Sequence, residues 1–334
     1  MKLVFEAHAE DLPGVTWATL FRRLWPAYRG WFLSEGITAR PTYSQAMAML
    51  RRHMPEILPT YERLCELAGG SDLAARFLSL YRPPAFMSGC SQAVWTDGEP
   101  VLIRNYDYSP YLCDALVLNT RWNGRRVIAM SDCLWGCLDG INEDGLAVSL
   151  TFGGRQAVGD GFGIPIVLRY LLETCSSAAE AAAALRRIPT HMSYNVTALD
   201  RSGTYFTAEL APDRSPVVYQ KPIATNHQGA IEWHHHARVT ATLERERFLG
   251  AHLAEAPDAP PTAEAFAELF LHPPLYATAY GRGFGTLYTA VYRPARGEAE
   301  FLWPGVSWRQ SLARFEEGAR EVRLLAQPLA TGFS

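Results

Sequence analysis

The stretch Met87-Ser88-Gly89-Cys90-Ser91-Gln92-Ala93-Val94 decides the fold, and Cys90 is its centre. A cysteine attacks as the thiolate, but an ordinary thiol has a pKa of about 8.5 and is mostly neutral in the cell, so a base is needed nearby. Cleavage directly before Cys90 would free its own α-amino group, whose pKa of about 7.7 to 8.0 suits proton transfer near neutral pH. Gly89 suits such a cleavage, because glycine adopts the unusual backbone angles that bring the thiol to the preceding carbonyl. The sequence therefore predicts self-cleavage between Gly89 and Cys90.

The residues after Cys90 predict a β-hairpin. An apolar run reaches Trp95, the turn Thr96-Asp97-Gly98 follows, and a second run extends through Ile103. The second strand would return Arg104 and Asp107 to the start of the first strand. We therefore expect a guanidinium and a carboxylate to flank the thiol.

Each of these residues also has an ordinary structural explanation. A cysteine after a glycine is most often a small buried hydrophobic residue. An arginine and an aspartate three positions apart usually form a solvated pair. Only the combination favours catalysis, and it requires Cys90, Asp107 and Asn226 to share one cavity that a ligand can reach.

Four segments, in chain order, resemble the bacterial relatives of isopenicillin N acyltransferase, with the choloylglycine hydrolases as more distant cousins. The segments are Gly89-Cys90, Arg104-Asn105-Tyr106-Asp107, Asp139 to Val148, and Ala224-Thr225-Asn226-His227. The resemblance extends over residues 85–305. It implies an N-terminal-nucleophile enzyme of the α+β class with a four-layer αββα sandwich, a family whose members mostly break or make linear, non-peptide amide bonds.

The resemblance also implies roles for individual residues. Cys90 would be the nucleophile, Asp107 would orient the new amino group, and Arg104 would lie behind the thiolate. Cleavage would divide the chain into residues 1–89, a helical segment that acts as a propeptide or α-subunit, and residues 90–334, the N-terminal-nucleophile domain or β-subunit.

By the same resemblance, the side-chain amide of Asn226 would donate to the oxyanion. A second donor would be a main-chain N–H near Thr151 or Phe152. The bile-salt enzymes often carry an asparagine side chain at that second place, so a steroid conjugate is a less expected substrate.

Aromatic residues near the thiol are candidates for an acyl pocket, although ordinary core packing explains any one of them equally well. The candidates are Tyr106, Tyr108, Trp135 and Phe152. The expected partner is a small acylated amide, with an acyl donor such as acyl-coenzyme A as a further candidate, and no cofactor is expected. Water taking the acyl group would make the protein a hydrolase and an amine would make it an acyltransferase, so both alternatives stay open, as does a homo-oligomer.

The sequence also allows three rival interpretations. Cys90 and His227 could form a thiolate-imidazolium pair of the papain kind. The run His234-His235-His236 suggests a metal site, but adjacent residues on a helix or strand point in different directions and three in a row do not converge on one ion. The fold could also serve as a non-catalytic binding module, although such a module has no reason to keep Arg104, Asp107 and Asn226 together.

Composition points to a globular protein with a small partner. The 334 residues carry a formal net charge of -3 without blocks of like charge, which argues against binding to nucleic acid or an anionic membrane. The start of the chain reaches Glu6 before an apolar core accumulates, and the later apolar run from Ile164 to Leu172 is too short to span a bilayer. We therefore expect the protein to be located in the cytoplasm. Six cysteines in so long a chain do not make a disulfide scaffold.

Periodicity divides the chain into helical and strand-rich parts. Apolar residues at helical spacing predict helices within residues 13–82, 165–187, 238–253 and 262–271, with Ser177 and Thr262 as caps. Strands are expected at 114–122, 125–131, 146–152, 195–199, 204–209, 216–220, 222–226, 286–292 and 298–303. Helices, two antiparallel blocks and further helices fit a four-layer sandwich.

Overall fold

The computed structural model describes residues 1–254 and 262–325. Its α-helices are α1 (Val15–Phe32), α2 (Tyr43–His53), α3 (Leu58–Leu67), α4 (Asp72–Leu78), α5 (Ile164–Thr174), α6 (Ala178–Arg187), α7 (His234–Val239), α8 (Thr242–Ala254) and α9 (Ala263–Glu268). Its strands are β1 (Lys2–Glu10), β2 (Gly89–Trp95), β3 (Val101–Tyr108), β4 (Leu116–Thr120), β5 (Val127–Asp132), β6 (Gly136–Asn142), β7 (Leu146–Phe152), β8 (Tyr194–Asp200), β9 (Tyr205–Ala211), β10 (Arg214–Tyr219), β11 (Ile223–Ala224), β12 (Gly285–Arg293), β13 (Glu298–Trp303), β14 (Val306–Ser311) and β15 (Gly318–Arg323).

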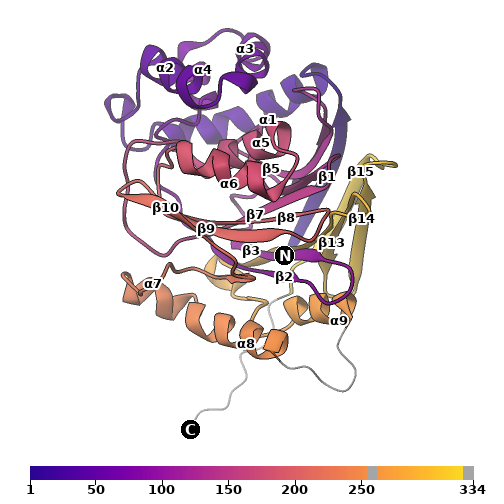
Figure 1. Cartoon of the computed structure of the whole chain (residues 1–334). Coiled ribbons are helices and arrows are strands. Elements are labelled where there is room, and N and C mark those ends of the chain that lie inside the picture. The colour runs from indigo at the N-terminus through magenta and orange to yellow at the C-terminus, as the bar shows by residue number, and fades with distance from the viewer. Residues whose placement is uncertain (255–261, 326–334) are drawn as a thin grey trace.

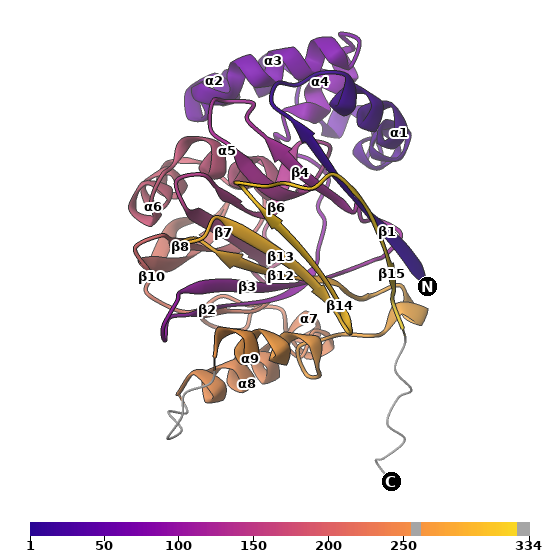
Figure 2. The same cartoon turned by 90° about the vertical axis from the view of Figure 1, so that its right-hand side faces the viewer.

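Two sheets face each other and helices cover both outer faces (Figures 1 and 2). Within the described residues, one sheet has nine strands in the order β10-β9-β8-β7-β6-β5-β4-β1-β15, and the other has six in the order β11-β2-β3-β12-β13-β14. Helices α1 to α6 lie beyond the larger sheet, and α7 to α9 lie beyond the smaller one. The protein is therefore the four-layer αββα sandwich of the α+β class that the resemblance implied.

The helices begin where their capping residues predict. Ser177 accepts the N–H of Glu180 at 3.3 Å at the start of α6, and Thr262 accepts the N–H of Ala265 at 3.2 Å at the start of α9. These side chains satisfy N–H groups that have no partner inside the helix. The boundary before α9 is therefore predictable from sequence. The expected helix at 238–253 is instead two helices, α7 and α8.

The N-terminal segment is not wholly helical, which corrects the sequence prediction. Lys2–Glu10 forms β1, which pairs parallel with β4 and antiparallel with β15 inside the larger sheet. Alternate side chains of β1 point between the sheets, where the ring of Phe5 lies 4.9 Å from that of Trp303. Phe5 and Ala7 are fully buried, so the period-two alternation that defines a strand was present in the sequence. The segment is thus built into the core.

The strand predictions that depended on turn chemistry are confirmed. Asn123-Gly124 lies between β4 and β5, and Gly124 has a φ of 84°, which suits glycine at such a turn. Strand β7 spans the predicted residues 146–152, and β12 pairs with β13 as expected. The expected strand at 222–226 shortens to β11, so Asn226 lies just after a strand. Strands β6, β14 and β15 were not predicted.

None of the described helices is long and apolar enough to cross a lipid bilayer.

Candidate active site

The β2–β3 hairpin places the predicted site residues side by side. Its register pairs Cys90 with Tyr106, and it pairs Gly89 with Asp107. Arg104, also on β3, points its guanidinium at the thiol, and its Nη2 lies 3.3 Å from the sulfur of Cys90. A hairpin with a short turn thus converts a separation of fourteen residues into direct contact.

Arg104 is held in place from several sides. Its Nε donates to the carbonyl of Leu150 at 2.8 Å on the facing sheet, and its Nη1 contacts Tyr288 at 3.1 Å and the carboxylate of Asp139. Asp139 also accepts the hydroxyls of Tyr288, at 2.6 Å, and Tyr292. Burial acts to lower the pKa of Arg104, but Cys90, Tyr288 and Asp139 outweigh it and raise this pKa above its ordinary value. The thiol therefore faces a fixed positive charge.

Asn226 reaches the same point from the end of β11. Its Oδ1 accepts the main-chain N–H of Cys90 at 2.9 Å. Its Nδ2 donates to the carbonyls of Ser88, at 3.3 Å, and Phe152, at 3.1 Å. In the uncut chain both amide hydrogens of Asn226 are therefore taken by main-chain oxygens, one of them just before the predicted cleavage point.

Arg245, on α8, is a site residue that sequence reasoning missed. Its guanidinium donates to the carbonyl of Cys90 at 2.5 Å, to the hydroxyl of Ser91 at 2.7 Å and to Oδ1 of Asn226 at 2.7 Å. It also lies 3.7 Å from the carboxylate of Asp107. The sequence around it, Thr242–Ala254, shows an ordinary charged helix, so no local signal distinguishes Arg245 from its neighbours.

Asp107 is buried beside the predicted cleavage point. Its Oδ1 accepts the hydroxyl of Thr286 at 2.6 Å. Burial raises the pKa of Asp107, while Arg245 and Thr286 act in the opposite direction. A Cβ added at Gly89 would lie 3.0 Å from Cβ of Asp107, so only a glycine fits without displacement here.

The thiol itself is closed off in the uncut chain. Cys90 is 0% exposed, and the hydroxyl of Ser88 lies 3.7 Å from its sulfur. The site residues meet in one place as the hypothesis requires, but a ligand has no direct access to the sulfur in this form. The chain that leads into β2, from Phe86 to Ser88, has no regular secondary structure, and its Ser88 contacts the sulfur.

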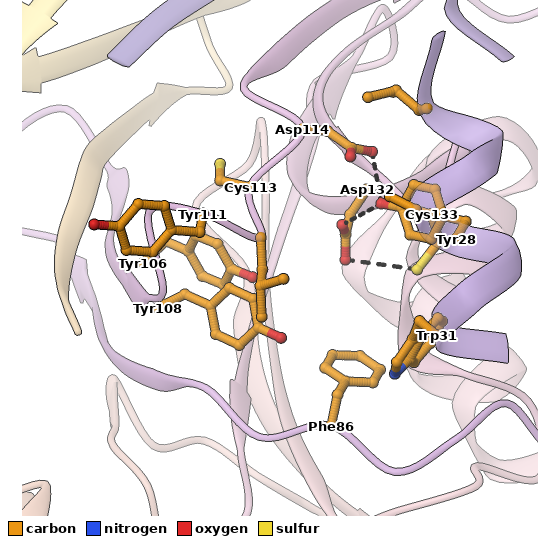
Figure 3. Close-up of a pocket in the computed structure, with 13 residues that line it drawn as sticks. Tyr28, Trp31, Phe86, Tyr106, Tyr108, Tyr111, Cys113, Asp114, Asp132 and Cys133 are labelled. Atoms are coloured by element: carbon orange, nitrogen blue, oxygen red, sulfur yellow. Dashed lines mark hydrogen bonds between the residues drawn. The ribbon is translucent and has the colours of Figure 1, made fainter. Parts of the chain in front are cut away.

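A cavity of about 190 Å³ lies next to this constellation, between α1 and the strands β3 and β5 (Figure 3). Tyr106 and Tyr108, two of the candidates for an acyl pocket, line this cavity. Trp135 does not, which corrects that prediction: it is fully buried, and its indole N–H donates to the carbonyl of Leu78 at 2.8 Å under the N-terminal helices. Phe152 packs instead against Tyr194 and the ring of His236.

The predicted second oxyanion position lies close to Asn226. The carbonyl of Phe152 accepts from Asn226, which places the end of β7 beside that amide. The hydroxyl of Thr151 donates to the carbonyl of Thr225 at 2.8 Å and accepts from Asn195 at 3.1 Å, so its side chain is occupied structurally. The hydroxyl of Thr151 is therefore not free to donate to an oxyanion.

His227 does not serve the thiol in this arrangement. Its Nε2 lies 3.1 Å from Glu246, and its Nδ1 lies 3.0 Å from the hydroxyl of Thr242. The hydrogen bond from His227 lowers the pKa of Glu246 to about 2. Both ring nitrogens are thus engaged away from Cys90, which removes support for the papain-like alternative.

The three consecutive histidines lie at the start of α7, and the ring of His236 stacks at 5.0 Å on that of Trp233. Across residues 1–254 and 262–325, no three histidine, cysteine, aspartate or glutamate side chains are grouped to hold a metal ion.

Solved structures similar to this chain share little sequence with it. Penicillin V acylase from Agrobacterium tumefaciens is 14% identical, with 71% of this chain and 92% of that chain covered and a TM-score of 0.47. A conjugated bile acid hydrolase variant from Clostridium perfringens is 11% identical, covering 73% and 100%, with a TM-score of 0.42. An N-acylethanolamine-hydrolyzing acid amidase ortholog from Caenorhabditis elegans is 16% identical, covering 62% and 93%, with a TM-score of 0.43. No curated protein sequence matched.

The decisive match is to a family model. It describes acyl-coenzyme A:6-aminopenicillanic acid acyl-transferases and matches residues 94–308, which is more than half of the chain. The matched residues include Arg104, Asp107 and Asn226, and the match begins shortly after Cys90. The chain therefore belongs to the acyl-coenzyme A:6-aminopenicillanic acid acyl-transferase family, a family of acyl-transfer enzymes.

Proposed function

We propose that the chain is a cysteine N-terminal-nucleophile amidohydrolase or acyltransferase that acts on the linear amide bond of a small acylated molecule after cleaving itself between Gly89 and Cys90. The observation that carries the proposal is the double contact at Cys90. Its sulfur lies 3.3 Å from Arg104, and its main-chain nitrogen lies 2.9 Å from Oδ1 of Asn226. Cys90 thus carries both the sulfur that would attack and the nitrogen that, once freed, would transfer the proton.

The maturation step follows from this arrangement. The sulfur of Cys90 attacks the carbonyl carbon of Gly89, the C–N bond breaks, and the freed nitrogen takes a proton to become the α-amino group. Water then hydrolyses the resulting ester to the carboxylate of Gly89 and the thiol of Cys90. Asp107 lies beside Gly89 and Asn226 holds the nitrogen, so both ends of the breaking bond have neighbours that suit the reaction.

Cleavage would also open the site. The hydroxyl of Ser88 lies 3.7 Å from the buried sulfur, and the carbonyl of Ser88 accepts one hydrogen of the Asn226 amide. Movement of the new C-terminus at Gly89 would expose the sulfur and release this amide hydrogen for another oxygen. The covered thiol is therefore the property expected of a precursor.

Turnover uses the same groups on a substrate. The thiolate, stabilised by Arg104, attacks the amide carbonyl, and Asn226 together with a main-chain N–H of the β7 end stabilises the oxyanion. The α-amino group passes a proton to the leaving amine, and an acyl-thioester remains on Cys90. Attack by water gives hydrolysis and attack by an amine gives acyl transfer.

A panel of acyl amides, followed by mass spectrometry, tests the proposal. Wild-type protein should release the amine, and Cys90→Ala should release none, while Cys65→Ala, which removes a thiol on α3 away from the site, should match wild type. Added hydroxylamine should divert the acyl group to a hydroxamate if the thioester forms. Turnover by Cys90→Ala at the wild-type rate would exclude Cys90 as the nucleophile.

A further inference from the structure

The cavity beside the site combines aromatic walls with acidic groups. Six aromatic side chains line it, from α1, the segment before β2, β3 and the β3–β4 connection: Tyr28, Trp31, Phe86, Tyr106, Tyr108 and Tyr111. Two carboxylates, Asp114 and Asp132, lie at the end nearest α1 (Figure 3). An aromatic cavity for an apolar acyl chain alone has no use for this acidic pair.

The two carboxylates share one hydroxyl. Tyr28 Oη lies 2.8 Å from Asp114 and 3.1 Å from Asp132, and it accepts the N–H of Cys133 at 2.8 Å. A hydroxyl has a single proton to donate, so it serves one carboxylate at a time. Asp132 also accepts from the thiol and the main-chain N–H of Cys133, and Asp114 accepts from the main-chain N–H of Leu134. These donors around the pair are all neutral.

The pair also lacks a positive partner among the described residues. Arg23 acts to lower the pKa of Asp114, and Arg104 acts to lower that of Asp132. Both arginines, however, form their ion pairs elsewhere, Arg23 with Glu6 and Arg104 with Asp139. Burial raises the pKa of Asp114, with a further rise from the charge of Asp132, and burial also raises the pKa of Asp132. Carboxylates in this state gain stability from any cation that enters.

A second, independent feature is the hydroxyl of Tyr194. It is buried and has no hydrogen-bond partner among the described residues. Tyr194 does not itself line the cavity, but its ring lies 6.4 Å from that of Phe86, which does. Burial raises the pKa of Tyr194, so the hydroxyl stays neutral and can accept a hydrogen bond.

The cavity is open to the solvent, and one of its walls adjoins the thiol. Tyr111 and Leu112 form its rim and are 73% and 63% exposed. On the inner side, the Tyr106 ring lies 4.8 Å from the guanidinium carbon of Arg104, and Tyr106 is the strand partner of Cys90. A molecule bound in the cavity could thus have one end against the acidic pair and the other against Tyr106, the wall that adjoins the thiol.

We propose that this cavity binds the protonated amino group of the substrate, with the aromatic faces and the Asp114–Asp132 pair as its recognition elements. Aromatic rings attract a cation through their electron-rich faces, and two carboxylates supply the counter charge. The substrate class is therefore an amide that carries a primary ammonium group a short chain away from the reacting bond. The link to catalysis rests on the proposed function, whereas the binding itself does not.

Calorimetry with small probes tests the binding without catalysis. The probes are 2-phenylethylamine, 2-phenylethanol and phenylacetate, which share a ring and differ in charge, and the proteins are the full-length wild type and Cys90→Ala. We expect the amine to bind at least about tenfold tighter than the alcohol and the acid in both proteins, since the gain comes from the cation. Equal affinities, or tightest binding of phenylacetate, would overturn the proposal.

Variants identify the site. Asp114→Asn/Asp132→Asn keeps the shape of both side chains and should reduce the preference for the amine to less than about threefold, because the counter charge is lost. Asp160→Asn, at an exposed aspartate that pairs with Arg82, should keep it. A double variant that retains the full preference places the cation elsewhere and refutes the proposal. If that variant does not fold, the three probes on the wild-type chain still decide.

The outcomes separate this inference from the proposed function. If Cys90→Ala binds the amine selectively but still turns over amides, the nucleophile assignment fails and the pocket assignment stands. If Cys90→Ala is inactive and no preference for the amine is seen, the pocket assignment fails and the nucleophile assignment stands.

Discussion

The side-chain oxygen of Asn226 accepts the main-chain N–H of Cys90 at 2.9 Å, across 136 residues of sequence. Arg245 donates to the same oxygen at 2.7 Å, so two donors fix which way the amide faces. The amide nitrogen must then point to the carbonyls of Ser88 and Phe152. This one relationship orients both the nitrogen that would become the α-amino group and the donor that would stabilise an oxyanion.

Self-cleavage predicts a mass change that depends on one sulfur. Purified wild-type protein should give two masses under denaturing conditions, corresponding to residues 1–89 and 90–334, because the thiol and the Gly89 carbonyl belong to adjacent residues. Cys90→Ala should give a single full-length mass, and Cys65→Ala should behave as wild type. Intact mass spectrometry is the measurement. A wild-type chain that stays whole while it turns over substrate would contradict the cleavage step.

The two pieces should stay together after cleavage. Strand β1 pairs on both sides inside the larger sheet, and Phe5 packs between the sheets against Trp303. Size-exclusion chromatography of cleaved protein should therefore show one species of about the uncut size, and denaturant should separate it. Phe5→Ala should loosen the association, since truncating a buried aromatic costs about 3 to 5 kcal/mol. Val4→Ala, on the exposed side of the same strand, is the control.

How much of this was predictable depends on the range of the interactions. The β2–β3 hairpin, with Cys90 and Arg104 in contact, is local and follows from turn residues and alternation. The position of Asn226 came from resemblance, because a contact across 136 residues leaves no local pattern. Arg245 was missed because an arginine on a charged helix is usually solvated. Trp135 was misplaced because an aromatic residue near a site in sequence is as often core as pocket.

Strand β1 shows a different limit. Its alternation of buried residues, with Phe5 and Ala7 inward, is typical of a strand, but the segment is short and lies before a long helical region. The strands that pair with β1 lie far from it in the sequence: β4 is more than 100 residues away and β15 more than 300. The sequence therefore shows the alternation of a strand, but the strands with which it pairs are known only from the folded sheet.

Gly89 should be needed for cleavage. A Cβ at this position would lie 2.6 Å from Cζ of Phe284 and 3.0 Å from Cβ of Asp107, so Gly89→Ala must displace the bond that reacts. We expect cleavage to slow by about tenfold or more, since small misplacements of reacting groups are costly. Gly30→Ala, where no atom lies within 4 Å, is the matched control.

The same clash offers a rescue. Replacing Phe284 by leucine in the Gly89→Ala background removes one of the two contacts and should restore part of the rate, measured as the appearance of the two pieces on a denaturing gel. Wild-type cleavage in Gly89→Ala alone would show that the available space is not limiting.

We expect Arg245 to support cleavage and turnover by holding Asn226 and Asp107. Arg245→Met removes a donor to the Asn226 oxygen and the cation 3.7 Å from Asp107, so the amide can rotate and the pKa of Asp107 rises further. We expect cleavage and turnover to fall by about 10- to 100-fold, and the acidic limb of the pH–rate profile to move to higher pH. Arg247→Met, at an exposed position on the same helix, should change neither. A pH profile that does not move would limit Arg245 to a structural role.

The acidic pair predicts how stability depends on pH. Burial and the charge of Asp132 raise the pKa of Asp114 to about 8, against about 3.9 in an unfolded chain. A carboxyl whose pKa is higher in the folded state contributes its full stabilisation only below the unfolded pKa. This contribution is lost progressively as the pH rises from the unfolded value to the folded one, and nothing further is lost above it. Asp114→Asn stays neutral, so its melting temperature relative to that of wild type should rise between about pH 4 and pH 8, by about 2 °C or more in total, and then stay constant above pH 8. Asp160→Asn should show a constant difference, and 2-phenylethylamine should narrow the gap by stabilising only the wild type. Melting curves that keep a fixed separation across this range would mean that the pair is already compensated within the protein.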